Sequence, residues 1–361
     1  KYSGEDTLFF PTNKGNMEFD VFASVFYMIS RYEEYLDFRK DKYGRFAASQ
    51  SLAYKYDFLQ FPIVNIWIRK LAESLKKMFP DFIYTPPGFQ YRSTIDIDVA
   101  WMVKNKPFYR CAARFSRHLI NGSFKKICYD FNIIKNKIKD PFESYEFILE
   151  KDKSDPIFFI LAGNGWGKDK NIPVSNRNWK NLVRKLDNRA NIGIHPSFRS
   201  FCKLKRIIKE KATLEAITGA RIKRSRQHFL RFRFPQTFRM LEIAGIENDF
   251  SLGFADNTGF RAGASIPFYF YDLERERISN LKLWPFVAMD RTLKDYLKLN
   301  PDQAIYQLHK LISVLKKEGG YFIPVWHNDS LSDHGEWKGW RKVYTQLFDF
   351  LKKNEKNDKI S

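Results

Sequence analysis

The sequence predicts an α/β fold in which about seven parallel strands form a closed or nearly closed barrel. After residue 90, short apolar segments alternate with amphipathic segments of helical spacing, which is typical of βα units around a parallel sheet. Several apolar segments end on an ionisable residue, as catalytic side chains do at the carboxyl ends of barrel strands. With 361 residues and 44% hydrophobic residues, the chain is long enough for one large domain or two ordinary ones.

The first 86 residues have a different pattern of apolar and polar residues, and we expect a mostly helical accessory region there. Apolar residues at helical spacing cover 20–37 and 62–79. Pro80, and then Pro86-Pro87-Gly88, interrupt this pattern and mark a boundary. The expected organisation is therefore a helical region over residues 1–86, followed by the barrel over residues 87–361.

The alternation after residue 90 gives the expected elements in order. Pro235 and Pro301 open two of the helices, because proline is favoured in the first helical turn. The expected strands are residues 91–99, 157–162, 191–195, 220–230, 265–271, 283–288 and 320–326. The expected helices are residues 123–137, 179–188, 201–218, 235–244, 301–317 and 339–353.

The run Ser93-Thr94-Ile95-Asp96-Ile97-Asp98 places two acids at the end of the first of these strands. Alternate residues of a strand share a face, so both carboxylates point the same way. Two like charges side by side are costly unless a cation or a shared proton relieves them. A metal ligand beside a general base meets this condition, and two solvated acids on an edge strand are the structural alternative.

Other ionisable residues follow later strands. His195 and His327 end strands, His228 lies on or beside another, and Arg261 sits in a Gly-rich loop. At one end of a barrel these side chains would share a site. Each also has a structural reading: a strand cap for His195, a surface or salt-bridging residue for His228, and an aromatic core pair with Trp326 for His327. Arg261 could instead bond loop carbonyls.

In their order along the chain, these motifs resemble those of the polysaccharide deacetylase family, also called carbohydrate esterase family four. The first motif is present in its Asp-x-Asp variant. The matching stretches are Thr94-Ile95-Asp96-Ile97-Asp98, His195-Pro196-Ser197, Phe260-Arg261-Ala262-Gly263 and Trp326-His327-Asn328. They span about residues 91 to 330, and the resemblance implies a distorted (β/α) barrel preceded by a segment outside the catalytic pattern.

The resemblance implies a metal-dependent hydrolase that removes N-acetyl groups from an amino sugar in a glycan. The expected cofactor is a divalent metal, with zinc as the first choice. By similarity, Asp98 is a metal ligand and Asp96 is the general base. Arg261 would orient Asp96, and His327 would be the general acid that protonates the leaving amine. An acid and a base need different environments to hold opposite protonation states at one pH.

One position departs from the family's pattern. The second motif usually carries another His four residues before the His-Pro pair, and this position is Asn191 here. An Asn side chain is a weak ligand for zinc. We expect His228 to complete the metal site with Asp98 and His195, with Asn191 or water as the alternatives. The departure also leaves open a catalytically inactive protein of the same fold that binds a glycan or an anionic surface.

Aromatic residues near these motifs could contact a sugar. Trp101 and Trp166 could stack on sugar faces, and buried packing is the alternative for both rings. The aromatic run over residues 268–271 is better explained as core and groove wall than as a cofactor site.

The net charge of +21 favours an anionic partner. Basic residues concentrate in 104–117, 125–139, 203–233 and 352–359, and they would suit an anionic or lipid-linked substrate surface. Solvated helix faces are the structural alternative. No helix-turn-helix, zinc-finger or RNA-recognition pattern occurs, so we expect no nucleic-acid partner and keep nucleic-acid binding as the least favoured function.

Cysteine usage and hydropathy bear on the compartment. Cys111, Cys128 and Cys202 are widely spaced and odd in number, which predicts neither a disulfide framework nor a cysteine zinc site. No apolar run reaches the roughly 18 residues of a transmembrane helix. No signal-peptide pattern follows Lys1, and a lost targeting segment stays open. We expect a cytoplasmic protein, peripheral to the membrane where it meets one.

Overall fold

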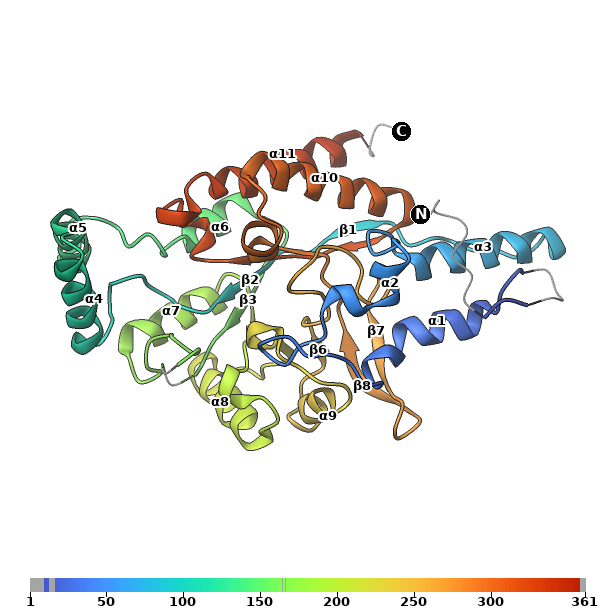
Figure 1. Ribbon diagram of the computed structural model, residues 1–361, viewed down its shortest axis with the longest axis horizontal. Coiled ribbons are helices and arrows are strands. Elements are labelled where there is room, and N and C mark those ends of the chain that lie inside the picture. The colour runs from blue at the N-terminus through green and yellow to red at the C-terminus, as the bar shows by residue number, and fades with distance from the viewer. Residues whose placement is uncertain (1–9, 13–16, 164, 166, 358–361) are drawn as a thin grey trace.

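The computed structural model describes residues 10–12, 17–163, 165 and 167–357, and the protein has a mixed α/β fold (Figure 1). The main sheet has nine strands in the order β7-β8-β6-β5-β4-β3-β2-β11-β9. From β8 to β9 all neighbours are parallel, and β7 is antiparallel to β8. A second sheet pairs β1 with β10 in parallel. The strands are β1 (Phe89–Tyr91), β2 (Thr94–Ile97), β3 (Ile157–Ile160), β4 (Asn191–Ile194), β5 (Arg224–Ser225), β6 (Asn248–Asp249), β7 (Phe268–Asp272), β8 (Arg277–Leu283), β9 (Ala288–Met289), β10 (Gly320–Phe322) and β11 (Pro324–His327).

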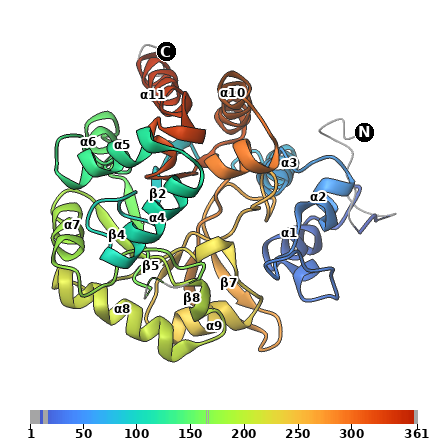
Figure 2. The ribbon, with the colours of Figure 1, turned by 60° about the vertical axis from the view of Figure 1, so that its left-hand side comes forward.

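Helices connect most of the parallel strands and surround the sheet. Figure 2 shows α6 to α11 in an arc around the strands. One of the longest, α10, begins where the sequence provides a cap: Asn300 and Gln303 form a capping box before Pro301. No described helix is both long enough and apolar enough to span a membrane. The helices are α1 (Val21–Ile29), α2 (Leu52–Lys55), α3 (Ile63–Met78), α4 (Phe108–Ile120), α5 (Phe124–Ile134), α6 (Tyr145–Lys151), α7 (Arg177–Asp187), α8 (Leu204–Thr218), α9 (Gln236–Ile243), α10 (Pro301–Glu318) and α11 (Trp340–Asn357).

The closed barrel of seven parallel strands is not formed. β7 and β9 end the strand order, and no pairing joins them within the described ranges. β7 also runs against the others, because only a short turn separates it from β8 and such a turn forces an antiparallel hairpin. The observed fold is therefore an open, mostly parallel sheet with one antiparallel edge strand.

Two of the expected strands are cut short for local reasons. The segment 283–288 falls between β8 and β9, where Pro285 lacks the donor that a central strand needs. The segment 220–230 contributes only β5, because the chain turns into a 3-10 helix at His228–Leu230. Phe229 and Leu230 have positive φ values in that turn, of 61° and 52°. This turn brings His228 off the strand and over the end of the sheet.

The centre of the sheet is buried on both faces. All four residues of β2 and all four of β3 are buried, as expected for parallel strands covered by helices. Gly193 of β4 allows Phe159 of β3 to pack across it, since a Cβ at Gly193 would lie 2.5 Å from the Phe159 ring. This close packing fixes the position of β4 relative to β3, and His195 directly follows β4.

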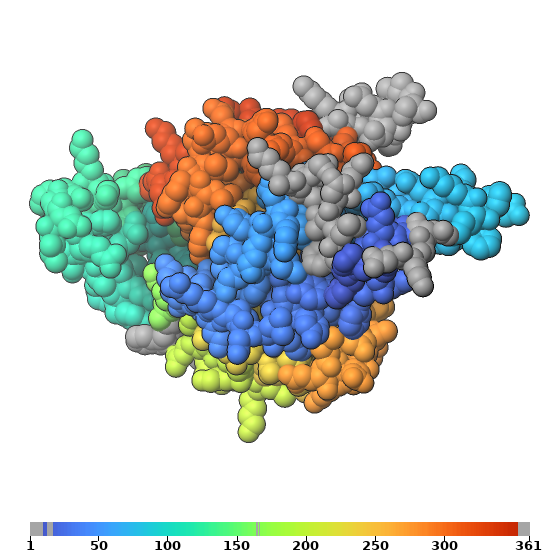
Figure 3. Space-filling view, turned by 45° about the vertical axis from the view of Figure 1, so that its right-hand side comes forward, coloured from blue at the N-terminus to red at the C-terminus, as the bar shows by residue number. Residues whose placement is uncertain are grey.

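The N-terminal region packs against the sheet part of the molecule. Its apolar cluster includes Met28, Ile63 and Trp67, and it also contains Phe254 and Ala264 from the later chain. Figure 3 shows these N-terminal helices, coloured blue, lying against the rest of the molecule. The expected helix 62–79 is confirmed as α3, whereas 20–37 divides into α1 and a 3-10 helix at Tyr32–Glu34.

Candidate metal centre

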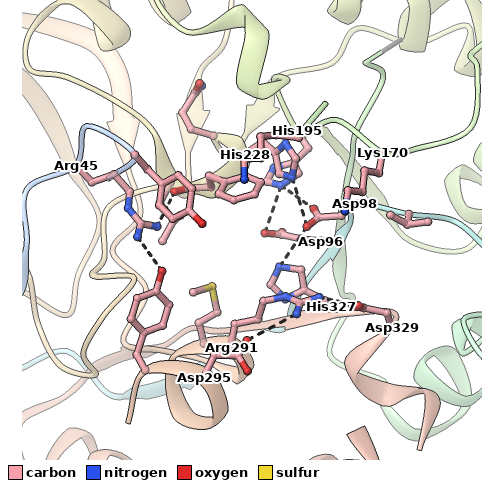
Figure 4. Close-up of a pocket in the computed structure, with 18 of the residues that line it drawn as sticks. Arg45, Asp96, Asp98, Lys170, His195, His228, Arg291, Asp295, His327 and Asp329 are labelled. Atoms are coloured by element: carbon pink, nitrogen blue, oxygen red, sulfur yellow. Dashed lines mark hydrogen bonds and ion pairs between the residues drawn. The ribbon is translucent and has the colours of Figure 1, made fainter. Parts of the chain in front are cut away.

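Three of the expected site residues meet at the carboxyl ends of neighbouring strands. Asp98 follows β2, His195 follows β4, and His228 opens the turn after β5. Asp98 Oδ1 lies 3.2 Å from His195 Nε2, and Asp98 Oδ2 lies 3.4 Å from His228 Nε2. One ligand atom from each residue lies within 4.8 Å of the others, as a metal site requires. Figure 4 shows both rings above Asp98, with His327 below it.

The other ring nitrogen of each histidine is held from behind. His195 Nδ1 lies 2.5 Å from the Arg226 carbonyl oxygen, and His228 Nδ1 lies 3.0 Å from Asp169 Oδ1. Metal-binding histidines are commonly oriented this way, because the outer bond turns the free nitrogen toward the metal. Both Nε2 atoms consequently face Asp98.

The donor set fits a divalent metal. Asp98 Oδ1 is buried and accepts no hydrogen bond, although His195 Nε2 is only 3.2 Å away. A buried carboxylate oxygen without a partner is costly, and a cation at this point would relieve it. Two imidazoles and one carboxylate are the protein ligands of many catalytic zinc sites, which leave a further position open.

Electrostatics couple these groups strongly. Burial alone would raise the pKa of the Asp98 carboxyl, but the His228, His195 and His327 imidazoles hold it well below its usual range. Burial lowers the pKa of His228, and the Asp98 and Asp169 carboxylates outweigh this effect and raise it to about 9. The cluster therefore concentrates opposite charges in a buried space.

Asp96 is oriented by Arg226, a residue that we did not predict for the site. Arg226 Nη1 donates to Asp96 Oδ1 at 2.8 Å, and Nη2 donates to Thr94 Oγ1 at 2.9 Å. Its Nε donates to the Phe250 carbonyl oxygen at 2.9 Å, and the side chain is fully buried. Residues 224, 226 and 228 alternate along an extended segment, so a shared face with His228 was the signal that could have identified Arg226.

The prediction that Arg261 orients Asp96 is wrong. Arg261 Nε and Nη2 donate to Glu34 at 2.9 and 2.6 Å, and Nη1 donates to the Gly253 carbonyl oxygen at 2.8 Å. Its Nε and Nη2 thus face the N-terminal region and its Nη1 faces the Gly253 loop, so none of these bonds reaches Asp96. Arg261 is a structural residue that holds the 3-10 helix after α1 against its own loop.

His327 lies at the same end of the sheet. It ends β11, in register with Asp96 of β2, and its Nε2 lies 3.8 Å from Asp98 Oδ2. Its Nδ1 lies 2.8 Å from Asp290 Oδ1, and its backbone N–H donates to Asp290 Oδ2 at 2.7 Å. Burial lowers the pKa of His327, but the Asp290 and Asp98 carboxylates raise it to about 9. Asp290 directly follows the apolar run that ends in β9, which is the signal we missed.

Asn191 lies at the wrong end of its strand to be a ligand. It begins β4 opposite Ile157, the first residue of β3, and its side chain donates to Asp155 Oδ2 at 2.5 Å. His195 is at the other end of β4. Of the two residues considered for completing the site, His228 alone lies beside Asp98.

Of the two tryptophans proposed to stack on sugars, Trp101 is not available for that role. Trp101 is buried, and its Nε1 donates to Glu143 at 2.6 Å. Trp166 lies outside the described residues.

A cavity of about 990 Å³ opens above the centre. Asp96, Asp98, His195, His228 and His327 line its floor. Lys42, Tyr43 and Arg45 from the N-terminal region line one wall (Figure 4 labels Arg45). The volume is in the range of pockets that enclose a small ligand.

Comparisons with known proteins give limited similarity. Residues 1–80 match the model of a family of unknown function (DUF7033). No curated protein matches the chain. The chain is similar to a proposed polysaccharide deacetylase from Mycobacterium smegmatis, with 14% identity, 74% of this chain and 86% of that chain covered, and a TM-score of 0.46.

Two further solved structures are similar at a lower level. One is a mutant, with restored enzymatic activity, of a CE4 family pseudoenzyme: identity is 11%, coverage is 75% of this chain and 65% of that chain, and the TM-score is 0.37. The other is a polysaccharide deacetylase from Bacillus cereus: identity is 11%, coverage is 75% and 89%, and the TM-score is 0.35. Because the identities and TM-scores are this low, the site is interpreted from the side chains of this protein and not from these structures.

Proposed function

We propose that this protein is a metal-dependent hydrolase that removes N-acetyl groups from an amino sugar in a glycan. The observation that supports this most directly is the meeting of Asp98, His195 and His228 around a carboxylate oxygen that lacks a hydrogen-bond partner. The order of the motifs along the chain, which resembles that of polysaccharide deacetylases, supports the same reaction.

Asp98, His195 and His228 would hold the divalent metal, with zinc as the expected ion. Bound there, the metal would polarise the amide carbonyl and lower the pKa of water. The outer bonds from the Arg226 carbonyl and from Asp169 keep both imidazoles turned toward that position. Three protein ligands leave room for the substrate, as catalytic zinc sites require.

Asp96 is suited to take a proton from the attacking water. Its Oδ1 is occupied by Arg226, and its Oδ2 lies 3.8 Å from His195 Nε2, next to the proposed ligand atoms. The ion pair with Arg226 fixes the carboxylate, so its free oxygen is directed at the floor of the cavity. Positioned bases of this kind contribute about 10²- to 10⁴-fold to a rate.

His327 is suited to give a proton to the leaving amine. Its Nδ1 is held by Asp290, so its Nε2 faces the cavity beside Asp98. A pKa of about 9 keeps the ring protonated near neutral pH. Water adds to the carbonyl carbon, the C–N bond breaks, and the nitrogen receives the proton from His327, so the products are acetate and a free amine.

The test combines metal analysis with acetate release from N-acetylglucosamine oligomers. Asp98→Ala and His195→Ala should lose both bound metal and acetate release, whereas His327→Ala should keep the metal and lose turnover by about 10²- to 10⁴-fold. Full activity in either ligand variant would refute the proposal. A protein that binds the oligomers but holds no divalent metal, even when supplied, would instead be the inactive binding protein.

A further inference from the structure

Three cations approach one aromatic ring in the cavity wall. Lys42 Nζ and the Arg45 guanidinium carbon lie 5.2 and 4.8 Å from the centre of the Tyr43 ring. Lys168 Nζ, from the segment after β3, lies 5.5 Å from the same ring centre. Two segments far apart in the sequence therefore bring positive charge to one place beside the metal centre.

The Arg45 guanidinium already makes hydrogen bonds within the protein. Its Nε donates to Asp41 at 2.7 Å, Nη1 to the Phe229 carbonyl oxygen at 3.0 Å, and Nη2 to the Tyr296 hydroxyl at 2.8 Å. Arg45 thus ties the 41–45 loop to two other walls of the cavity. This arrangement holds the loop that carries Lys42 and Tyr43 in place.

The two lysines are in a different position. Lys42 and Lys168 are exposed, and within the described part of the chain neither has an ion pair with a carboxylate. The acids of the opposite wall each have a cationic partner within the protein, since Arg291 pairs with Asp329, and Lys294 pairs with Asp295 and Glu336. Among the described residues that line the cavity, the lysines without an ion pair are Lys42 and Lys168, on the Tyr43 side, and Lys170, nearer to Asp98.

We propose that Lys42 and Lys168 bind a phosphate group carried by the glycan substrate. The inference rests on the proposed function and specifies its substrate class. Two lysines are mobile point charges that suit a phosphate, whereas a lone carboxylate would need only one of them. It also gives the N-terminal region a role, because this region supplies Lys42 and the loop that presents it.

The test is equilibrium binding by calorimetry of glucose 1-phosphate, glucose and glucuronate, which carry no N-acetyl group and are not turned over. Glucose 1-phosphate should bind more tightly than either other sugar. In the double variant Lys42→Gln/Lys168→Gln, the affinity for glucose 1-phosphate should fall about tenfold or more. A tenfold fall is equivalent to the loss of roughly 1.4 kcal/mol of binding free energy. The exposed Lys205→Gln is the matched control and should bind as the parent does.

Each other outcome has a defined meaning. Equal binding of glucuronate, or equal binding of inorganic phosphate alone, would overturn a site for a sugar phosphate. Unchanged affinity in the double variant would also overturn it. If glucose 1-phosphate binds through the two lysines but no acetate is released from acetylated sugars, the phosphate site stands and the proposed hydrolase fails.

A separate observation concerns α4 and α5, which form a hairpin at one side of the molecule (Figures 1 and 3). No residue of α4 is buried. Phe108 is 87% exposed, Ile120 is 84% exposed, and Phe124 just beyond the turn is 66% exposed. The helices thus leave large apolar side chains in water, and a patch of this kind marks an interaction surface.

The same hairpin is strongly basic. Residues 104–139 contain ten Lys or Arg residues and a single acid, Asp130. Asp130 is buried and pairs with Arg114 and His118, so it joins the two helices and offers no charge to a partner. Lys125 and Lys126 are exposed directly beside Phe124. Exposed apolar side chains flanked by lysines suit the interface of an anionic membrane.

The base of the hairpin is fixed beside the cavity. Arg110 Nη1 donates to the carbonyl oxygens of Lys170 and Asn171 at 2.9 and 3.1 Å, and the Tyr129 ring stacks on His334 at 5.1 Å. Lys170 also lines the cavity. The hairpin follows Asp98 along the chain, so it leaves the sheet at the end that carries the metal centre.

We infer that the α4–α5 hairpin docks on an anionic lipid surface. A second copy of this chain fits less well, because a symmetric contact would place the same basic surfaces against each other. Docking there would bring the cavity to glycans held at the membrane, including lipid-linked ones. Membrane docking does not depend on the proposed hydrolysis.

The test is co-sedimentation of the full chain with vesicles of phosphatidylcholine, with or without about one-third phosphatidylglycerol. Binding should require phosphatidylglycerol and should weaken with salt. Ile120→Ser/Phe124→Ser and Lys125→Glu/Lys126→Glu should each reduce it about tenfold or more. The matched controls, Ile278→Ser/Tyr306→Ser, which change side chains that are both 68% exposed, and Lys310→Glu/Lys317→Glu, should bind as the parent does.

Two results would overturn the docking surface. The first is equal vesicle binding by the hairpin variants and their controls. The second is a change of oligomeric state in the hairpin variants, measured by analytical ultracentrifugation, with vesicle binding unchanged. That second result would show that the apolar patch pairs two copies of the chain.

Discussion

Asp169 shows how one residue outside the motifs prepares the metal centre. Its Oδ1 lies 3.0 Å from His228 Nδ1 and also accepts the backbone N–H of Phe198 at 2.6 Å. Gly163 packs closely on it, since a Cβ at Gly163 would lie 3.2 Å from Asp169 Cβ. The carboxylate is thus fixed by the backbone before any metal binds, and it fixes His228 in turn.

Replacing Asp169 by Asn should weaken metal binding. The amide keeps the shape of the side chain, but it no longer provides the charge that favours the required orientation of His228. Outer partners of this kind change metal affinity by about 10- to 100-fold. Zinc titration against a competing chelator would measure the change. Asp155→Asn is the matched control, because Asp155 contacts Asn191 at the far end of β4; equal affinity in both variants would contradict this role for Asp169.

Replacing Arg226 by Lys should reduce turnover while the metal stays bound. Arg226 donates to Asp96, Thr94 and the Phe250 carbonyl from separate nitrogens, and one ammonium cannot reach all of them. Asp96 would then lose its fixed orientation, and kcat should fall more than KM rises. Arg239→Lys provides the control, because Arg239 makes a similar forked pair with Asp272 away from the centre. Loss of metal in Arg226→Lys would mean that it acts mainly through His195.

At the scale of elements, short strands carry much of the site. β5 and β6 each have two residues, and periodicity in the sequence cannot identify elements of that length. They are held together by side chains as well as by backbone: the Ser225 and Ser251 hydroxyls donate to Asp249 Oδ2 at 2.6 and 3.0 Å. Asp249 therefore fastens the strand that leads to Arg226 and His228.

Asp249 should make stability depend on pH in a defined direction. Burial raises its pKa to about 6, although the Ser225 and Ser251 bonds lower it. Between about pH 4 and pH 6 the folded state then binds more protons than the unfolded state, so stability falls as pH rises. A shift of about two units corresponds to about 3 kcal/mol. In urea unfolding, the difference between the parent and Asp249→Asn should change by this order from pH 4 to 7; a constant difference would contradict the assignment.

For the whole molecule, the sequence predicted well which residues meet at the site. It predicted less well which side chains orient them and how the sheet is arranged. Asp98, His195 and His327 were identified because each follows an apolar segment, and parallel strands bring their carboxyl ends together. The exchange of Arg226 for Arg261 was missed, because motif order does not specify which arginine reaches Asp96 in space; only the face that Arg226 shares with His228 pointed to it. The open sheet depends on pairing between distant strands, which a local pattern does not encode.

A buried charge network links the N-terminal region to the later chain. Glu34 accepts from Arg261 Nη2 at 2.6 Å and from Arg31 Nε at 2.9 Å, and Arg31 also bonds the Arg261 carbonyl oxygen. Burial would raise the pKa of the Glu34 carboxyl, but Arg261 and Arg31 lower it. Both partners are buried cations. Removal of the Glu34 charge would take away the carboxylate that pairs with Arg261 and one of the two that pair with Arg31, which also bonds Glu33.

Glu34→Gln should therefore destabilise the protein as a whole, by about 3–5 kcal/mol, which is typical for breaking a buried ion pair. Because the N-terminal cluster shares Phe254 and Ala264 with the later chain, a single unfolding transition should move to lower temperature. Glu73→Gln is the matched control: Glu73 pairs with Arg69 at the surface, and such pairs contribute about 0–1 kcal/mol. Calorimetry would follow both variants. If Glu34→Gln produced a separate early transition and left the main one in place, the N-terminal region would be an independently folding unit, and its loop could not be a fixed wall of the cavity.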